Sequence, residues 1–391
     1  MKFAVIGFGC KVNQYQAEVI RESLLSFGFL ETYPEDADIV VINGCLVTHT
    51  AGAEALRAAN KYSKNAKVIA TGCAGASKEF EDFIQVEPDK LDTLPQILGI
   101  EGKTTPTIQG FKNHTRAMVA IQYGCDNFCS YCIVPYLRGK PRNRDFDSII
   151  RECNTLAESG YPEIVLCGTE IGHFDNLSQL LSELSNIDKL KRIRISSINP
   201  RHLTPSLTTE ILGIRKVAPH LHLPLQSGSD KVLRLMNRGY DTDHFRKIVK
   251  AARAVDPHVG ITTDIIVGFP GETQENHEET LIFMREIGFY KCHVFPYSKR
   301  EGTEAADMES TLDDSTVKNR AKQTRDLASD LATQALCDNI DLRAEVLCET
   351  DSRGFTGSYL RVRVKDGAPP GELVLCRLKK TTDSILIGER E

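Results

Sequence analysis

The sequence lacks a long hydrophobic run, an excess of positive charge and a second C-x2-C cysteine pair. No stretch of eighteen apolar residues occurs among its 391 residues, so we expect no membrane-spanning helix and no membrane partner. The chain opens on a strand-like pattern rather than on a signal peptide, which predicts a soluble, cytoplasmic protein. The formal net charge of −5 excludes a global positive field, so only a local basic surface could bind a nucleic acid.

Three of the twelve cysteines lie within eight residues, at Cys125, Cys129 and Cys132. Their spacing is C-x3-C-x2-C, and they follow the apolar run 118–121. A structural zinc site needs four ligands, usually in two paired half-sites, and the second pair is missing. Three thiols cannot all form disulfides with one another, and a cytosolic chain disfavours disulfides. Three thiolates on one loop suit a cubane iron–sulfur cluster with one open iron, with structural zinc and incidental cysteines as alternatives.

Three further cysteines follow the strands of a predicted N-terminal sheet. Strands and helices alternate over the first hundred residues, which indicates a small parallel sheet. Cys10, Cys45 and Cys73 each come after a strand, and each is preceded by a glycine. Because the carboxyl ends of parallel strands share one edge, we expect the three thiols to converge and to hold a second cluster. The alternative is three buried cysteines that act as small hydrophobic residues. The expected strands are 2–8, 38–42 and 67–70, and the expected helices are 14–27 and 52–62.

The remainder of the chain predicts two more structural units. Residues 88–114 are polar and rich in turn residues, as in a linker. Residues 115–308 contain six strand–helix repeats, which predicts a partial (β/α)6 barrel. His222 and His293 lie inside its strands, where a histidine is usually a satisfied core group. After a charged helix at 313–335, short strands separated by glycine and proline predict a small antiparallel barrel. Its expected strands are 343–348, 354–364, 373–377 and 384–388.

The cysteine loop and the residues 133–139 that follow it resemble the radical S-adenosylmethionine (SAM) signature, in the version found in methylthiotransferases. In that family three thiolates hold a [4Fe–4S] cluster, and SAM chelates the open iron. Electron transfer into the sulfonium then leaves a deoxyadenosyl radical, which abstracts hydrogen from carbon that no side-chain base could deprotonate. The resemblance therefore implies that the cofactors perform the difficult step and that the protein positions them.

The resemblance also implies roles for residues outside the cysteine loop. Turns after the barrel strands are expected to line the SAM pocket, although each residue could equally belong to an ordinary turn or a buried hydrogen bond. Glu170 is expected to accept a hydrogen bond from the SAM ammonium, Arg138 to bind its carboxylate and Tyr131 to pack over adenine, with a core position for Tyr131 as the alternative. The remaining candidate contacts are Gly168, Thr169, Ser197, Gln226 and Asp264.

The resemblance extends to both ends of the chain. The N-terminal segment, 1–101, is similar to the methylthiotransferase domain that holds an auxiliary [4Fe–4S] cluster on three cysteines, here Cys10, Cys45 and Cys73. It departs from the family pattern at Gly44 and Gly75, where threonine and glutamine are common. The last segment, 338–391, resembles the RNA-binding TRAM domain. Its expected RNA-contacting residues are Arg361, Arg363 and Lys365, with Phe355 and Tyr359 available for stacking.

Together these resemblances imply an enzyme that replaces a hydrogen on an unactivated carbon with a methylthio group, with two [4Fe–4S] clusters and two SAM molecules. The segments 9–15 and 297–303 are most similar to the subfamily that acts on threonylcarbamoyl-adenosine beside the tRNA anticodon. Isopentenyl-adenosine in tRNA and a ribosomal protein are the alternative substrates. An alternative of another class is a non-catalytic iron–sulfur or zinc protein that binds RNA. The implied partners are the tRNA anticodon loop, an electron donor such as a flavodoxin or ferredoxin, and a sulfur donor.

Overall fold

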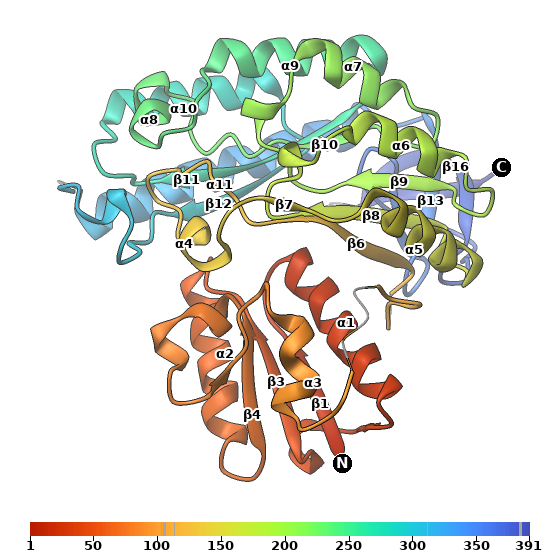
Figure 1. Ribbon diagram of the computed structural model, residues 1–391. Coiled ribbons are helices and arrows are strands. Elements are labelled where there is room, and N and C mark those ends of the chain that lie inside the picture. The colour runs from red at the N-terminus through yellow and green to blue at the C-terminus, as the bar shows by residue number, and fades with distance from the viewer. Residues whose placement is uncertain (103, 105–106, 113, 311, 383–384) are drawn as a thin grey trace.

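The computed structural model describes residues 1–391 except 103, 105–106, 113, 311 and 383–384. A curved central sheet divides the molecule (Figure 1). The N-terminal sheet lies on one side of it, and helices α7 (Pro205–Gly213), α9 (Thr242–Val255) and α10 (Gln274–Ile287) cover the other side. None of the described helices combines the length and the hydropathy that a membrane span needs.

The N-terminal sheet is parallel and buried on both faces, as the sequence predicts. Its elements are β1 Lys2–Gly7, α1 Lys11–Ser26, β2 Leu30–Glu31, β3 Ile39–Gly44, α2 His49–Tyr62, β4 Lys67–Gly72, β5 Ile84–Gln85 and α3 Leu94–Ile97. The strand order is β2-β1-β3-β4-β5. Successive residues of β3 point to opposite faces: Val40 and Ile42 pack with α2, whereas Ile39 and Val41 pack with α1. A run of apolar residues therefore satisfies both faces of this central strand.

Six parallel strands form most of the central sheet, in the order β6-β8-β9-β10-β11-β12, and the short β7 pairs antiparallel with β6 at its edge. Its two hydrogen-bonded halves are joined by bridges between Ile193 and Val217 and between Ser197 and His222. Each strand leads into a helix on the outer side, which confirms the open (β/α)6 arrangement. The elements are β6 Arg116–Tyr123, α4 Val134–Arg138, β7 Arg142–Asn143, α5 Phe146–Glu158, β8 Glu163–Gly168, α6 Leu177–Ser185, β9 Arg192–Ile195, β10 His220–His222, α8 Asp230–Leu235, β11 Gly260–Val267, β12 Lys291–Pro296 and α11 Asp314–Cys337.

The segment 88–114, which the sequence predicts to be a polar linker, is packed against both sheets where it is described. Leu94 is buried in the core of the N-terminal sheet, whereas Ile108 and Phe111 belong to the core of the central sheet. The backbone N–H of Ile108 donates to Glu152 Oε1 at 2.7 Å. Because most residues of this segment are polar, its composition does not predict that these three apolar side chains pack into the cores of the two sheets. Residues 103, 105–106 and 113 of this segment lie outside the described residues.

The C-terminal strands close into a five-stranded barrel, β13-β14-β15-β17-β16. The predicted strand 354–364 is divided by a turn at 357–360, and this extra strand changes the pairing. All neighbours are antiparallel except β15 and β17, which are parallel. Directions cannot alternate around a closed ring with an odd number of strands, so the predicted small barrel is confirmed, with one parallel pair among its antiparallel neighbours. The strands are β13 Arg343–Cys348, β14 Arg353–Thr356, β15 Arg361–Val364, β16 Leu373–Thr382 and β17 Ile385–Arg390; Ser384, predicted to begin the last strand, lies outside the described residues.

A buried charge network joins the central sheet to the C-terminal barrel. Arg194 Nε donates to Glu163 Oε1 at 3.0 Å, and Arg192 Nη1 donates to Glu163 Oε2 at 3.2 Å. The three side chains are at most 6% exposed. The barrel backbone also approaches closely, since a Cβ on Gly260 would lie 2.0 Å from the Ser358 carbonyl oxygen. The guanidinium groups of Arg192 and Arg194 also donate to the carbonyls of Glu345, Phe355, Thr356 and Gly357.

Candidate functional site

The structure brings Cys10, Cys45 and Cys73 together at the carboxyl edge of the N-terminal sheet. Cys45 is in hydrogen-bond contact with both Cys10 and Cys73, which lowers the pKa of Cys10 to about 6 and lowers that of Cys73 well below its usual value. The same contacts raise the pKa of Cys45. Gly9 lies against this group with φ +86°, and a Cβ there would be 2.3 Å from Cys45 Cβ. Only glycine therefore fits between the first strand and the thiols.

Arg138, the predicted partner of the SAM carboxylate, lies beside this N-terminal triad. Its Nε donates to Cys73 Sγ at 3.3 Å, and Nη1 donates to Gln16 Oε1 at 3.4 Å. Nη2 donates to Asn13 Oδ1. The short helix α4 ends against the turn that carries Cys73, so the guanidinium is buried among the three cysteines and partly offsets thiolate charge. Arg138 therefore follows Cys132 closely in the chain, but its side chain lies against the N-terminal triad.

The second triad lies on the loop between β6 and α4. The Cys125 N–H donates to the Gly139 carbonyl at 3.0 Å, and the Cys132 N–H donates to the Cys129 carbonyl at 2.9 Å. Gly124, with φ +75°, precedes the loop, and a Cβ there would lie 2.0 Å from a backbone oxygen. Burial raises the pKa values of Cys125 and Cys132 to about 12.

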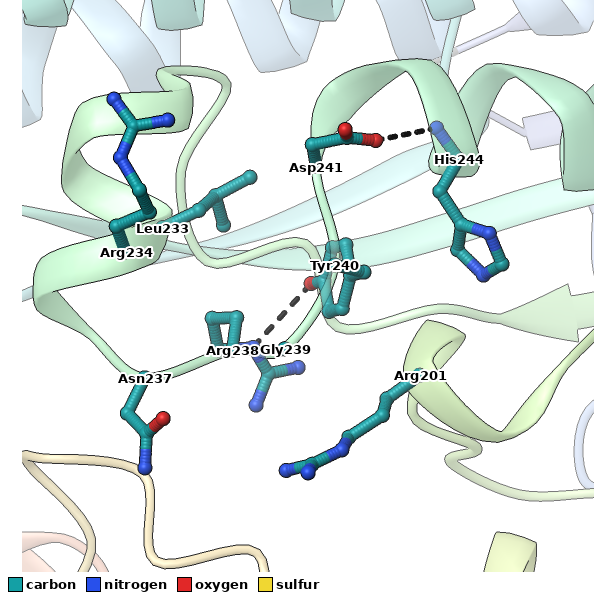
Figure 2. Close-up of a pocket in the computed structure, with 9 residues that line it drawn as sticks. All are labelled: Arg201, Leu233, Arg234, Asn237, Arg238, Gly239, Tyr240, Asp241 and His244. Carbon is teal, nitrogen blue, oxygen red and sulfur yellow. Dashed lines mark hydrogen bonds between the residues drawn. The ribbon is translucent and has the colours of Figure 1, made fainter.

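Arg238 is a site residue that the sequence analysis missed. Its Nη1 donates to Cys129 Sγ at 3.2 Å and to Tyr131 Oη at 3.3 Å, and Nη2 donates to the Pro224 carbonyl at 2.7 Å. Figure 2 shows Arg238 hydrogen-bonded to Tyr240, with Arg201 at the same side of a pocket of about 580 Å³. No local pattern distinguishes Arg238 from a surface arginine, because the contact joins segments more than a hundred residues apart.

The other predicted SAM contacts lie around the cysteine loop in several roles. Thr169 Oγ1 accepts from the N–H of Gly124 at 3.2 Å, so it positions the start of the loop. Glu170 Oε1 accepts from the N–H groups of Gly172 and Asn199, and burial raises its pKa. The Tyr131 ring packs edge-on against the Phe269 ring, with the ring centroids 6.4 Å apart. This contact favours the core position that was the alternative to adenine packing.

The remaining candidates are placed by backbone pairing. Gly168 ends β8, and a Cβ on this residue would lie 3.1 Å from the Ile171 side chain. Ser197 bridges to His222 between the two halves of the central sheet. Gln226 has φ +71° and pairs with Ile265 through its backbone.

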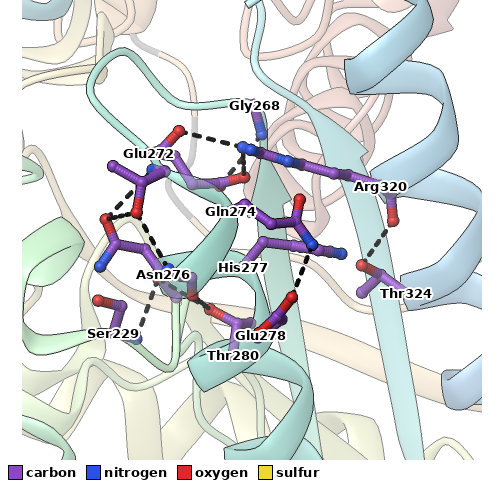
Figure 3. Close-up of polar contacts among 12 residues, drawn as sticks. Ser229, Gly268, Glu272, Gln274, Asn276, His277, Glu278, Thr280, Arg320 and Thr324 are labelled. Atoms are coloured by element: carbon purple, nitrogen blue, oxygen red, sulfur yellow. Dashed lines mark hydrogen bonds and ion pairs between the residues drawn. The ribbon is translucent and has the colours of Figure 1, made fainter.

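The segment that follows β11 is held against helix α11 (Figure 3), and its Phe269 also contacts Tyr131 of the cysteine loop. The Arg320 guanidinium donates to Glu272 Oε1 at 2.5 Å, and both side chains are at most 5% exposed. Gly268 has φ +73° and lies against Val317 of the same helix. The turn 268–272 is one of the turns predicted to line the SAM pocket, and the carboxylate of its Glu272 is used in this buried ion pair.

A cavity of about 500 Å³ begins at Cys10 and runs along the inner face of the central sheet. Asp264, a predicted SAM contact, lines it and accepts a hydrogen bond from His222 Nε2 at 3.2 Å. His222 Nδ1 also contacts Thr262 Oγ1 at 2.9 Å, as expected of a satisfied histidine. At the far end the Tyr359 ring stacks on His220 at 4.8 Å. Phe355 stacks on Tyr359 in turn, so each ring already has a partner within the protein, and their stacking on RNA bases stays a prediction.

The donor chemistry of both triads fits iron–sulfur clusters. Each triad supplies three soft thiols and has a buried arginine on one of its sulfurs, Arg138 on Cys73 and Arg238 on Cys129. Hydrogen bonds to cluster sulfurs of this kind tune cluster chemistry. In the part of the chain that the structure describes, no group of three or more His, Cys, Asp or Glu side chains has the arrangement of a single metal-ion site.

The acidity of Cys10 predicts selective alkylation of the metal-free protein. Cys10 is exposed and has a pKa of about 6, so we expect it to react with iodoacetamide at pH 7 before Cys125 and Cys132. The rate should rise as the pH increases through about 6 and then level off. Labelling is measured by peptide mass spectrometry in a Cys337→Ala background, because this substitution removes the other exposed thiol. Equal labelling of Cys10 and Cys125 at pH 7 would contradict this acidity.

Comparison with known proteins places these features in a family. Residues 119–284 match the radical SAM superfamily, and residues 2–93 match uncharacterized protein family UPF0004. The chain is 34% identical to a threonylcarbamoyladenosine tRNA methylthiotransferase, MtaB, from Chlamydia pneumoniae, over 99% of this chain and 97% of the relative. The chain belongs to the radical SAM tRNA methylthiotransferases. This membership confirms the resemblance identified from the cysteine motifs and implies SAM and a [4Fe–4S] cluster as cofactors.

Two kinds of methylthiotransferase are similar to the chain. A tRNA-2-methylthio-N(6)-dimethylallyladenosine synthase from Natranaerobius thermophilus is 36% identical, over 85% of this chain and 82% of the relative. Among solved structures, the radical SAM methyltransferase TsrM from Kitasatospora setae has a TM-score of 0.59 at 13% identity and covers 78% of this chain and 74% of its own. This structural similarity supports the fold alone.

Proposed function

We propose that this methylthiotransferase replaces a hydrogen of threonylcarbamoyl-adenosine beside the tRNA anticodon with a methylthio group, with two [4Fe–4S] clusters and two SAM molecules. The observation that carries the proposal is the presence of two thiol triads linked by one short segment. Only five residues separate Cys132 from Arg138, whose guanidinium contacts Cys73 of the other triad. A sulfur-carrying centre and a SAM-cleaving centre would therefore lie close enough to share a substrate.

The proposed ligands are Cys125, Cys129 and Cys132 for the cluster that binds SAM, and Cys10, Cys45 and Cys73 for the auxiliary cluster. When loaded, these sites supply reductive cleavage of SAM and the sulfur atom to be transferred. In the net reaction the hydrogen leaves with 5′-deoxyadenosine, and the methyl group comes from the second SAM. An external electron donor such as a flavodoxin or ferredoxin is proposed, and a separate sulfur donor is proposed to deliver sulfur to the auxiliary cluster.

The chain's own residues position and neutralise these centres. Arg138 and Arg238 each place a buried positive charge on a cysteine sulfur, and at Cys73 this charge lowers the pKa of the thiol and favours the thiolate form that a cluster requires. Thr169 fixes the start of the cysteine loop through the Gly124 N–H. On the C-terminal barrel, Arg361 and Arg363 are exposed on β15, and we propose that they and Lys365 contact the tRNA backbone in the anticodon arm.

Nucleoside mass spectrometry of tRNA from a deletion strain tests the proposed substrate. We expect the methylthio derivative of threonylcarbamoyl-adenosine to disappear and to return when the wild-type chain is supplied. Loss of the dimethylallyl derivative instead would assign the chain to the other similar subfamily. An unchanged tRNA profile together with an unmodified ribosomal protein would move it to the protein-modifying branch. Purified protein that yields no 5′-deoxyadenosine under strong reductant would indicate a non-catalytic RNA-binding protein.

A further inference from the structure

The cavity that begins at Cys10 contains two lysines. Lys11 and Lys291 both line it, and no hydrogen bond or ion pair joins the ammonium group of either lysine to a described residue. The cavity's two arginines differ in this respect, since Arg116 and Arg194 both pair with Glu163. Free positive charge is therefore concentrated at the end of the cavity nearest the N-terminal triad and along β12.

The acidic groups facing this cavity offset that positive charge only in part, because Asp264 interacts with Lys11 as well as with His222. Asp264 is the one acidic residue among the described residues that line it, and its carboxylate already contacts His222. Burial lowers the pKa values of His220 and His293, so both rings are neutral near pH 7. An occupant that carries a negative group would therefore find its counter-charge in Lys11 and Lys291.

The two candidate nucleosides differ in whether their substituent carries a negative charge. A threonylcarbamoyl substituent ends in a carboxylate, whereas a dimethylallyl substituent is an uncharged hydrocarbon. An apolar group in this cavity would desolvate the two ammonium groups and return no hydrogen bond, which is unfavourable. A carboxylate would form charge-assisted hydrogen bonds with them.

We propose that Lys11, supported by Lys291, determines substrate specificity by binding the carboxylate of the modified base. This inference rests on the proposed function and adds a physical reason for a lysine directly after Cys10. The position next to the N-terminal triad would hold the base between the sulfur-carrying thiols and the inner face of the central sheet. Lys11 acts on substrate selection and takes no part in bond breaking.

Two anticodon stem–loops that differ at one group provide the test. One carries threonylcarbamoyl-adenosine, and the other carries its carboxamide, which removes the charge and keeps the shape. Dissociation constants and KM values are measured with the reconstituted holoenzyme. For the wild type we expect the carboxamide to bind about 10- to 100-fold more weakly, the usual effect of a charge-assisted hydrogen bond. In Lys11→Gln the ratio between the two substrates should fall toward one, and Lys11→Arg should restore much of it.

Lys64→Gln is the matched control, because Lys64 is an exposed lysine outside the cavity; it should keep the wild-type ratio. Iron content is determined for every variant, and Lys291→Gln provides a second substitution if Lys11→Gln does not assemble. An unchanged ratio in both lysine variants would overturn the inference while leaving the proposed function intact. A wild-type enzyme that modifies neither stem–loop, or that modifies only a dimethylallyl one, would instead contradict the proposed function.

Discussion

Replacing Cys129 with alanine is expected to abolish cleavage of SAM and all methylthio transfer. Cys129 is the middle thiol of its triad and the one that Arg238 contacts, so its loss leaves two donors and a buried guanidinium without its sulfur. Two thiolates do not retain a cubane cluster, and iron should fall from about eight to about four atoms per chain. The measurements are iron content and the yield of 5′-deoxyadenosine under strong reductant.

Two matched substitutions make this result specific. Cys153→Ala removes a fully buried thiol of α5 outside both triads, and it should retain the wild-type iron content and activity. Cys73→Ala removes a ligand of the other proposed cluster, so it should lose similar iron but continue to form 5′-deoxyadenosine without methylthio transfer. If Cys129→Ala kept its full iron content and cleaved SAM, Cys129 would not be a ligand.

The second large effect is expected at Glu163, which holds the C-terminal barrel on the central sheet. Glu163→Gln preserves shape but leaves Arg192 and Arg194 buried without their counter-charge. Breaking a buried ion pair in this way costs about 3 to 5 kcal/mol of unfolding free energy. Urea denaturation followed by the intrinsic fluorescence of tyrosine, and limited proteolysis between α11 and β13, would report the change. The exposed pair of Glu158 and Lys189 is the control, since Glu158→Gln should cost less than about 1 kcal/mol.

The same network predicts a pH dependence with a definite sign. Burial opposes ionisation of Glu163, but Arg194, Arg192 and Arg116 outweigh it and lower the pKa of the carboxyl. A carboxyl with a lowered folded-state pKa stabilises the fold above its ordinary pKa of about 4.3, and this contribution is lost as the pH falls further. The stability difference between wild type and Glu163→Gln should therefore shrink under acidic conditions. A difference that stayed constant down to acid unfolding would contradict this assignment.

The sequence predicts those features that follow from local periodicity and strand direction. The convergence of Cys10, Cys45 and Cys73 was predictable because parallel strands present their carboxyl ends along one edge, whichever residues lie between them. The C-terminal barrel shows the limit of this approach. Residues 357–360 contain no strong break in the alternating pattern, so the sequence predicts one strand where two occur. That single miscount changed the predicted pairing of β15 and β17.

Contacts between distant segments could not be predicted from the sequence. Arg138 adjoins the second cysteine motif in the chain, yet its side chain contacts Asn13, Gln16 and Cys73 of the N-terminal sheet. Local sequence cannot reveal which sheet a short helix will abut. The stacking of Tyr359 on His220 could not be predicted for the same reason, because alternation indicates which side of a strand a ring occupies but not which domain covers it.

The stacking of Tyr359 on His220 has a consequence for shortened forms of the protein. The ring comes from the last structural unit, yet it forms the end wall of the cavity that starts at Cys10. Deleting the C-terminal barrel would remove a surface proposed to bind tRNA. It would also expose the cavity to bulk water at the wall that Tyr359 forms. A truncated enzyme would then lose its radical intermediate to reaction with solvent components, even with a substrate too small to contact the missing barrel.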